Sequence, residues 1–128
     1  MPVSERDRQI VDGVFRAMHE RAAGENAMMA LFAEDSVVTE PFSGQPQTHR
    51  GKPAIRAWFR EAVNQMAPDM ALKLDRLDMD GGRVRAEWTC TSVSMKGPMR
   101  GYDLYTIEGG LIKVAEFVVT EMPEFIQG

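Results

Sequence analysis

Apolar residues recur at the spacing of an α-helix in the first half of the chain. Between Ser4 and Gly24 they fall three and four positions apart, and Ser4 is a residue type that often caps the start of a helix. This pattern predicts a first helix that ends at Gly24. The same spacing predicts a short second helix over 25–33 and a third helix over 53–67.

A short segment between the second and third predicted helices has the composition of a strand. Residues 36–40 (SVVTE) are rich in β-branched side chains, and Pro41 closes the run. Residues 41–51 contain two Pro and two Gly among several polar residues. We therefore expect a loop there.

From residue 70 onward, apolar residues alternate with polar ones, which is the period of a β-strand. The alternation slips at Asp75–Arg76, so we expect a bulge there. Glycine-containing turns separate the runs, which predict strands over 70–79, 84–95, 99–108 and 111–120. Three helices, one early strand and a four-strand antiparallel meander indicate a single α+β domain over 1–128, with helices covering one face of a curved sheet.

Both faces of the last two predicted strands carry bulky side chains. Tyr102 and Leu104 on one face alternate with Asp103 and Tyr105 on the other. An antiparallel sheet that helices cover on one face usually has a polar second face. We therefore expect a second copy of the protein to cover that face, which makes a homodimer.

Composition argues against several classes of function. The chain has 128 residues, a formal net charge of −4 and no Lys/Arg cluster, which argues against a nucleic-acid or anionic-membrane surface. It lacks the apolar segment of a signal peptide, and no apolar run is long enough to span a membrane. The one cysteine, Cys90, cannot form an internal disulfide, and with only two His a zinc site is not expected. We expect a cytoplasmic protein without a metal or other cofactor.

Two carboxylates stand out because of their apolar neighbours. Glu40 ends the early strand, where a carboxylate that loses its hydration becomes a usable general base. Asp103 lies in the middle of a strand, where Asp is disfavoured, and could be a proton donor or second acid in a pocket. The structural alternative for Glu40 is an exposed acid paired with a nearby Arg. For Asp103 it is an ion pair with Arg100 or Arg16, or a position at a dimer contact.

Other residues with chemical potential give weaker signals. Trp88 could form a flat wall for a planar ligand, although a tryptophan in the core is commoner. His49 falls in the polar loop and is expected to be solvated, whereas His19 lies near the end of the first helix, which favours it there. Neither histidine has a Ser or Cys partner in a nucleophile motif, and we find no phosphate-binding loop or metal-binding motif.

Three stretches give the chain a resemblance to a known superfamily. These are LFAEDSVVTEPF, the G-x-x-A-I helix start at Gly51–Ile55, and GYDLYTIEGGLI. Together they resemble the nuclear-transport-factor-2-like superfamily, in its ketosteroid-isomerase-like and SnoaL-like polyketide cyclase branches, from the first helix to about Met122. The resemblance implies a cystatin-like α+β barrel, in which a cone-shaped, curved antiparallel sheet wraps around N-terminal helices and encloses an apolar cavity. It also implies dimers through the outer sheet face.

The resemblance suggests roles for individual residues. Glu40 stands where ketosteroid isomerases have their catalytic Asp before a Pro, and Asp103 matches the protonated acid of their oxyanion hole. The oxyanion-hole Tyr on the first helix aligns with about Arg16, and its supporting Tyr with about Phe59, so these Tyr donors are missing. Arg16 would stabilise an enolate, or hold Glu40 or Asp103 in a salt bridge. In SnoaL-like cyclases a late-strand Asp serves as acid and base, and Asp103 is a candidate for that role too.

These expectations combine into one main function and two alternatives. The main one is a cofactor-independent enzyme of isomerase or cyclase type, in which Glu40 removes a proton next to the carbonyl group of a small apolar ligand. Asp103, with Arg16 or Tyr105, would stabilise the resulting enolate. The alternatives are a non-catalytic ligand-binding or dimerisation module of the same fold, and an epoxide-type hydrolase, which would need an Arg between two acids. The side chains expected to line the pocket are aromatic or apolar: Phe15, Phe42, Phe59, Met66, Trp88, Tyr105 and Phe117.

Overall fold

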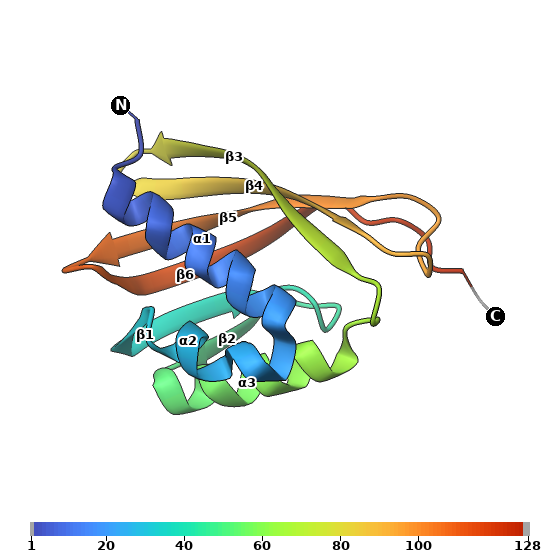
Figure 1. The fold of residues 1–128 in the computed structure, drawn as a ribbon, viewed down its shortest axis with the longest axis horizontal. Helices are drawn as coiled ribbons and strands as arrows, with labels where there is room; N and C mark the ends of the chain where they lie inside the picture. Colours follow the sequence, from blue (N-terminus) through green and yellow to red (C-terminus); the bar gives the residue numbers. More distant parts are fainter. Residues whose placement is uncertain (1, 127–128) are drawn as a thin grey trace.

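A computed structural model describes residues 2–126 (Figure 1). Its helical elements are α1 (Glu5–Glu20), the 3₁₀ turn η1 (Arg21–Gly24), α2 (Glu25–Met29) and α3 (Lys52–Gln65). Its strands are β1 (Phe32–Glu40), β2 (Gln47–Arg50), β3 (Ala71–Asp80), β4 (Arg83–Thr91), β5 (Met99–Glu108) and β6 (Leu111–Glu121). None of the helices in residues 2–126 is long and apolar enough to cross a membrane.

The strands of the described residues form one curved, unclosed sheet in the order β2-β1-β6-β5-β4-β3. β1 pairs with β6 in parallel, and the other neighbouring strands pair antiparallel. Figure 1 shows α1 running across the sheet, with α3 beside β1 and β2. Helices therefore cover one face of the sheet, and the predicted α+β class is confirmed.

The first helix begins as predicted but ends earlier. The Ser4 Oγ accepts a hydrogen bond from a backbone N–H three residues later (3.1 Å), which caps the helix start. The helix ends at Glu20, because Arg21 has a φ of 58° and the chain continues as the η1 turn. Gly24 closes this turn and is needed for packing, since a Cβ there would lie 2.4 Å from the carbonyl oxygen of Ala17.

Arg21 joins η1 to the end of α3. Its guanidinium donates hydrogen bonds to the carbonyl oxygens of Ala67 (3.0 Å), Pro68 (3.1 Å) and Met70 (3.4 Å). The last carbonyls of a helix have no partner within the helix, and the same is true of the turn that follows. The Arg21 guanidinium therefore provides hydrogen-bond donors for the carbonyl oxygens that follow α3, a helix that cannot continue through Pro68.

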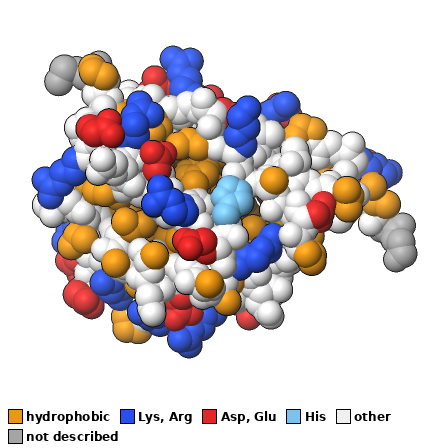
Figure 2. All heavy atoms as spheres, viewed as in Figure 1, with side chains coloured by type: hydrophobic (Ala, Val, Ile, Leu, Met, Phe, Trp, Pro, Cys, Tyr) orange, Lys and Arg blue, Asp and Glu red, His pale blue; other side chains and the backbone are white. Residues whose placement is uncertain are grey.

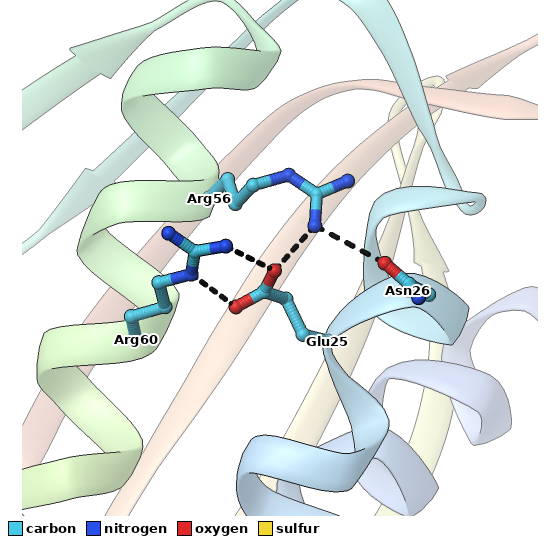
Figure 3. A network of polar contacts seen from close by, with 4 residues as sticks. All are labelled: Glu25, Asn26, Arg56 and Arg60. Carbon is cyan, nitrogen blue, oxygen red and sulfur yellow. Dashed lines mark hydrogen bonds and ion pairs between the residues drawn. The ribbon is translucent and has the colours of Figure 1, made fainter.

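A second polar network ties α2 to α3 (Figure 3). The Glu25 carboxylate accepts hydrogen bonds from Arg60 through Nε (2.5 Å) and Nη2 (3.0 Å), and another from Arg56. Arg56 also donates to the Asn26 side chain (3.2 Å). The hydrogen bond from Arg60 is the largest cause that lowers the pKa of Glu25 from its ordinary value. These contacts fix the short helix α2 against α3.

Two elements differ from the sequence-based expectation. The helix expected over 25–33 ends at Met29, because β1 already starts at Phe32, which is buried in the sheet. The loop expected over 41–51 contains β2, which pairs with β1. β2 is polar and lies at the edge of the sheet, so no apolar alternation marks it in the sequence.

The bulge predicted at Asp75–Arg76 is confirmed, because the pairing of β3 with β4 shifts register between Leu74 and Arg76. The strand predicted to reach residue 95 ends at Thr91. Beyond it, the Asp69 carboxylate accepts hydrogen bonds from the Ser92 hydroxyl (3.0 Å) and the Val93 N–H (2.7 Å). These contacts take the chain out of the sheet before β5 begins at the predicted position.

The two faces of the sheet differ in character. On the helix-covered face, alternate β4 side chains from Val84 to Cys90 are buried against the helices. The outer face carries a mixture of charged and apolar groups. The guanidinium of Arg85 lies 3.7 Å from the ring centroid of Tyr102, and Arg83 forms an ion pair with Glu116 (3.7 Å). The core and any enclosed site therefore belong to the helix-covered face.

Candidate functional site

Both predicted carboxylates lie on the helix-covered face of the sheet. Alternation along β1 puts Val38 and Glu40 on this face, and His49 of β2 faces the same way because it pairs with Val38. On β5, Asp103 pairs with Phe117 of β6 and shares this face. β6 lies between β1 and β5, so two strand spacings, roughly 10 Å, separate the backbones that carry the two acids.

Asp103 is a buried acid held by two hydrogen-bond donors. The residue is 6% exposed, and its Oδ1 accepts a hydrogen bond from Trp88 Nε1 (2.9 Å) while Oδ2 accepts one from the Tyr105 hydroxyl (2.7 Å). Burial raises the pKa of Asp103 to about 7, although both hydrogen bonds act in the opposite direction. Arg100 instead pairs with Glu121 (3.1 Å), so the alternative of an ion pair between Asp103 and Arg100 is wrong. Near neutral pH the acid therefore exists in both protonated and ionised forms.

The two donors to Asp103 are fixed in different ways. Burial, together with the neighbouring Asp103 charge, raises the pKa of Tyr105 well above its ordinary value, so its hydroxyl stays protonated. Trp88 reaches Asp103 because its cross-strand partner is Gly101. A Cβ at Gly101 would lie 2.6 Å from the indole Cζ2, so a larger residue there would displace the indole.

Glu40 is buried beside His49. It is 3% exposed, and its Oε1 accepts a hydrogen bond from the Phe42 backbone N–H (2.8 Å). Its Oε2 lies 2.8 Å from Nε2 of His49, whose side chain is 20% exposed. Among the described residues no Arg or Lys forms an ion pair with Glu40, so the histidine is its charged or polar side-chain partner. The expectation that His49 is a solvated loop residue is wrong.

Aromatic side chains connect the two polar centres. His49 stacks on Trp58 of α3 with 5.8 Å between ring centroids, and Trp58 lies 5.6 Å from Phe117. Phe117 also contacts Tyr105 edge-on (6.4 Å) and Phe42 (6.3 Å). The Phe117 ring thus lies between the Glu40–His49 pair and the acid on β5. In the space-filling view, hydrophobic side chains are recessed between charged ones near the centre (Figure 2).

Several residues predicted for the site lie elsewhere. Arg16 is exposed on α1, whose buried face includes Val14 and Phe15, so we correct the expectation that Arg16 stabilises an enolate or holds either acid. Phe15 and Phe59 are buried in the same core cluster as Trp88 and Tyr105, and their place in the lining of a pocket stays a prediction. Met66 lines a surface groove of about 730 Å³ between η1 and α3, which none of the polar site residues lines.

The other chemical possibilities gain no support. Because Arg100 is exposed and paired with Glu121, it does not lie between the two acids as an epoxide-type hydrolase would need. Within residues 2–126 there is no group of three or more His, Cys, Asp or Glu side chains arranged to hold a metal ion.

The contacts of His49 with Glu40 and Trp58 were not predicted from the sequence. The signal for His49 was weak, because it depends on a hairpin between 36–40 and a polar strand without apolar alternation. Trp58 lies within the apolar stripe of the predicted third helix, but a stripe does not show which of its members reaches a pocket.

Solved structures with the same fold include proteins of suggested and of unknown function. The chain is 21% identical to a candidate polyketide cyclase of Sinorhizobium meliloti, covering 90% of this chain and 100% of that one, with a TM-score of 0.72. It is 21% identical to a candidate ketosteroid isomerase of Kribbella flavida, covering 98% and 85%, with a TM-score of 0.70. A protein of unknown function from Burkholderia pseudomallei is 22% identical, covering 91% and 92%, with a TM-score of 0.72. This likeness shows the nuclear-transport-factor-2-like fold alone.

The family follows from the sequence itself. The profile of the SnoaL-like domain matches residues 11–115. The chain therefore belongs to the SnoaL-like family, which confirms the resemblance. No curated protein matches the sequence. Because one fold supports many activities, the reaction has to be argued from the site.

Proposed function

We propose that the protein is a cofactor-independent enzyme of isomerase or cyclase type that moves a proton next to the carbonyl group of a small apolar ligand. Membership of the SnoaL-like family, and structural likeness to a candidate polyketide cyclase and a candidate ketosteroid isomerase, support this class of reaction. The observation that carries the proposal is the environment of Asp103. It is a buried acid on the helix-covered face, held by Trp88 and Tyr105 instead of by a cation.

Asp103 acts at the carbonyl oxygen of the ligand. A protonated carboxylic acid donates a hydrogen bond or a proton to an oxygen whose negative charge grows as an enolate forms. An ionised Asp would repel that charge. The pKa of about 7 leaves a large share of the molecules with a protonated Asp103 at neutral pH. Tyr105 supports both states, because its hydroxyl can donate to the ionised acid or accept from the protonated one.

A base must take the proton from the carbon next to the carbonyl group. We assign this step to the Glu40–His49 pair, which extends the sequence-based assignment of the step to Glu40. The pair lies across β6 from Asp103, with the Phe117 ring in between. A ligand lying against Phe117 would present its oxygen to Asp103 and its acidic carbon to the pair. The apolar wall of Phe117 and Trp58 favours a small apolar compound.

The test uses NMR in D₂O to measure the rate at which the protein exchanges carbon-bound hydrogen for deuterium in a panel of small apolar ketones. We expect the wild type to exchange the protons next to at least one carbonyl group. Asp103→Asn should lower that rate by roughly 100-fold or more, because it removes the acid.

The matched control is Asp80→Asn, which changes an exposed acid at the end of β3 and should leave the rate unchanged. The absence of exchange for every ketone contradicts the proposal, and so does an equal rate in Asp103→Asn. Saturable ketone binding without exchange would favour the alternative of a non-catalytic ligand-binding module.

A further inference from the structure

We propose that Nδ1 of His49 is the proton acceptor of the site, and that Glu40 is a positioning residue that holds the imidazole in the required tautomer. The inference rests on the proposed proton-transfer function and changes the group that performs its first step. It is carried by the hydrogen bonds, burial and stacking of three residues from β1, β2 and α3.

Both oxygens of the buried Glu40 carboxylate have hydrogen-bond partners. Each of its two oxygens has one close partner, the Phe42 N–H on Oε1 and His49 on Oε2. Glu40 is 3% exposed and the His49 side chain is 20% exposed, so the imidazole is the more accessible member of the pair. A buried carboxylate that gives up a hydrogen bond to accept a ligand proton would leave a polar donor unsatisfied.

The contact with Glu40 fixes the tautomer of His49. An ionised carboxylate only accepts hydrogen bonds, so the contact with Oε2 requires a hydrogen on Nε2. In the neutral ring the lone pair is then on Nδ1. A carboxylate that orients a histidine in this way leaves the opposite ring nitrogen as the base.

Nδ1 of His49 is the ring nitrogen that a ligand can reach. Within residues 2–126, Nδ1 of His49 has no hydrogen-bond partner, and the one buried side-chain polar atom without a partner is the Ser36 Oγ. Nδ1 is therefore not sealed in the core. The side chain is 20% exposed, which is more than its carboxylate partner. A ligand or water can reach this nitrogen without displacing Glu40.

The surroundings also favour the charge that proton uptake creates. When the C–H bond next to the carbonyl group breaks, the proton goes to Nδ1 and the electron pair stays on the ligand as an enolate, stabilised at its oxygen by Asp103. The resulting imidazolium lies 2.8 Å from the Glu40 carboxylate and against the face of Trp58. Return of the proton from Nδ1 to another carbon completes an isomerisation without oxidant or reductant.

The chain provides an internal control in its other histidine, His19. Its Nδ1 lies 3.0 Å from the Phe15 carbonyl oxygen, which only accepts, and its Nε2 accepts a hydrogen bond from the Leu72 N–H (3.2 Å). His19 must therefore carry its hydrogen on Nδ1. The two histidines of the chain are expected to be opposite tautomers.

The first experiment needs no substrate. Two-dimensional ¹H–¹⁵N NMR of the imidazole rings, in uniformly labelled protein at a pH where both rings are neutral, identifies the tautomer of each histidine. We expect a hydrogen on Nε2 of His49 and on Nδ1 of His19. In Glu40→Gln the preference of His49 should weaken, while His19 should not change. A hydrogen on Nδ1 of His49 in the wild type overturns the inference.

The second experiment uses the deuterium exchange assay. His49→Ala should lose at least roughly 100-fold in rate. Added imidazole should restore part of that rate, because the cavity left by the side chain admits the missing base. Glu40→Gln should also be slower, but imidazole should not restore it, since its own histidine is still in place. Glu34→Gln, at an exposed acid on the same strand, is the matched control.

The outcomes separate this inference from the proposed function. Exchange that survives in His49→Ala but is lost in Glu40→Gln makes the carboxylate the base and overturns the inference, while the proposed function stands. Absence of exchange in the wild type refutes the proposed function. The tautomer measurement then still decides whether Glu40 holds His49 with a free Nδ1.

Discussion

Glu40 and Asp103 are both buried, and different hydrogen-bond partners stabilise each of them. Glu40 has an imidazole and a backbone N–H, one on each oxygen. Asp103 has two neutral donors, and burial leaves it protonated over a much wider pH range than an exposed Asp. An isolated buried charge is costly, so each acid depends on the hydrogen-bond donors that its neighbours provide.

The stability of the protein should depend on pH through Asp103. The unfolded chain releases this proton near the ordinary pKa of 3.8, whereas the folded protein keeps it up to about 7. Between these values the folded state binds more protons, so its stability falls as the pH rises through this window. Asp103→Asn should therefore raise the free energy of unfolding more at about pH 8 than at about pH 5. Urea unfolding at both pH values measures this, with Asp80→Asn as the control; an equal effect at both values would contradict it.

Individual residues show how far sequence reasoning can go at this scale. Asp103 was predictable because an Asp within an apolar strand is unusual. Arg16 was misassigned because alignment to a family places a residue along a helix, whereas the apolar stripe fixes which side faces the sheet. His49 could not be identified, because its partner Glu40 becomes a neighbour only through the β1–β2 pairing.

At the scale of secondary-structure elements, periodicity predicted the parts with a repeated apolar pattern. These are α1, α3 and the strands from β3 to β6. It did not predict β2, which has no apolar residue, or the end of α1 at a residue with positive φ. The early start of β1 was also missed, since Phe32 and Ala33 fit a short helix equally well by spacing alone. The boundaries of an element are therefore hard to predict from the sequence where they depend on strand pairing or on the local backbone conformation.

The packing of β4 on β5 gives a prediction for Gly101. A Cβ at this position would lie 2.1 Å from the Val118 carbonyl oxygen as well as against the Trp88 indole. Gly101→Ala should lower the free energy of unfolding by about 1–3 kcal/mol, as overpacking usually does. It should also shift the NMR signal of the Trp88 indole N–H, because the hydrogen bond to Asp103 would be disturbed.

The matched control for Gly101 is Gly82→Ala, in the β3–β4 turn, where a Cβ would meet nothing within 4 Å. Denaturant unfolding of both variants measures the difference. Equal stability of the two variants would show that the strands separate easily enough to admit a methyl group, and the close packing proposed for Trp88 would then be wrong.

At the scale of the whole molecule, the outer face of the sheet is the surface that we propose for association with a second copy. The partly exposed Tyr102 and Val118 lie there among charged side chains such as Arg85 and Glu116, whereas Leu104 is buried. This mixture is typical of a surface that can be covered by another copy, with apolar contacts and complementary charges. The homodimer stays a prediction, and we keep it as our proposal for this face.

Sedimentation velocity over a range of concentrations tests that proposal. We expect a dimer for the wild type and a shift toward monomer for Val118→Glu, because a buried carboxylate at the contact would lack a partner. Val93→Glu, at a side chain that is 82% exposed outside the strands, is the control and should remain dimeric. A monomeric wild type at every concentration would contradict the proposal.

The parallel pairing of β1 with β6 has a consequence for protein synthesis. Val38 pairs with Ala115, so β1 leaves the ribosome long before its partner does. Until then β1 has only the short strand β2 beside it, and its other edge is open to wrong partners. His49 and Glu40 are translated early, but Phe117 and Asp103 join them only when the sheet is completed. The proposed site is therefore incomplete until β5 and β6 have been synthesised and have joined the sheet.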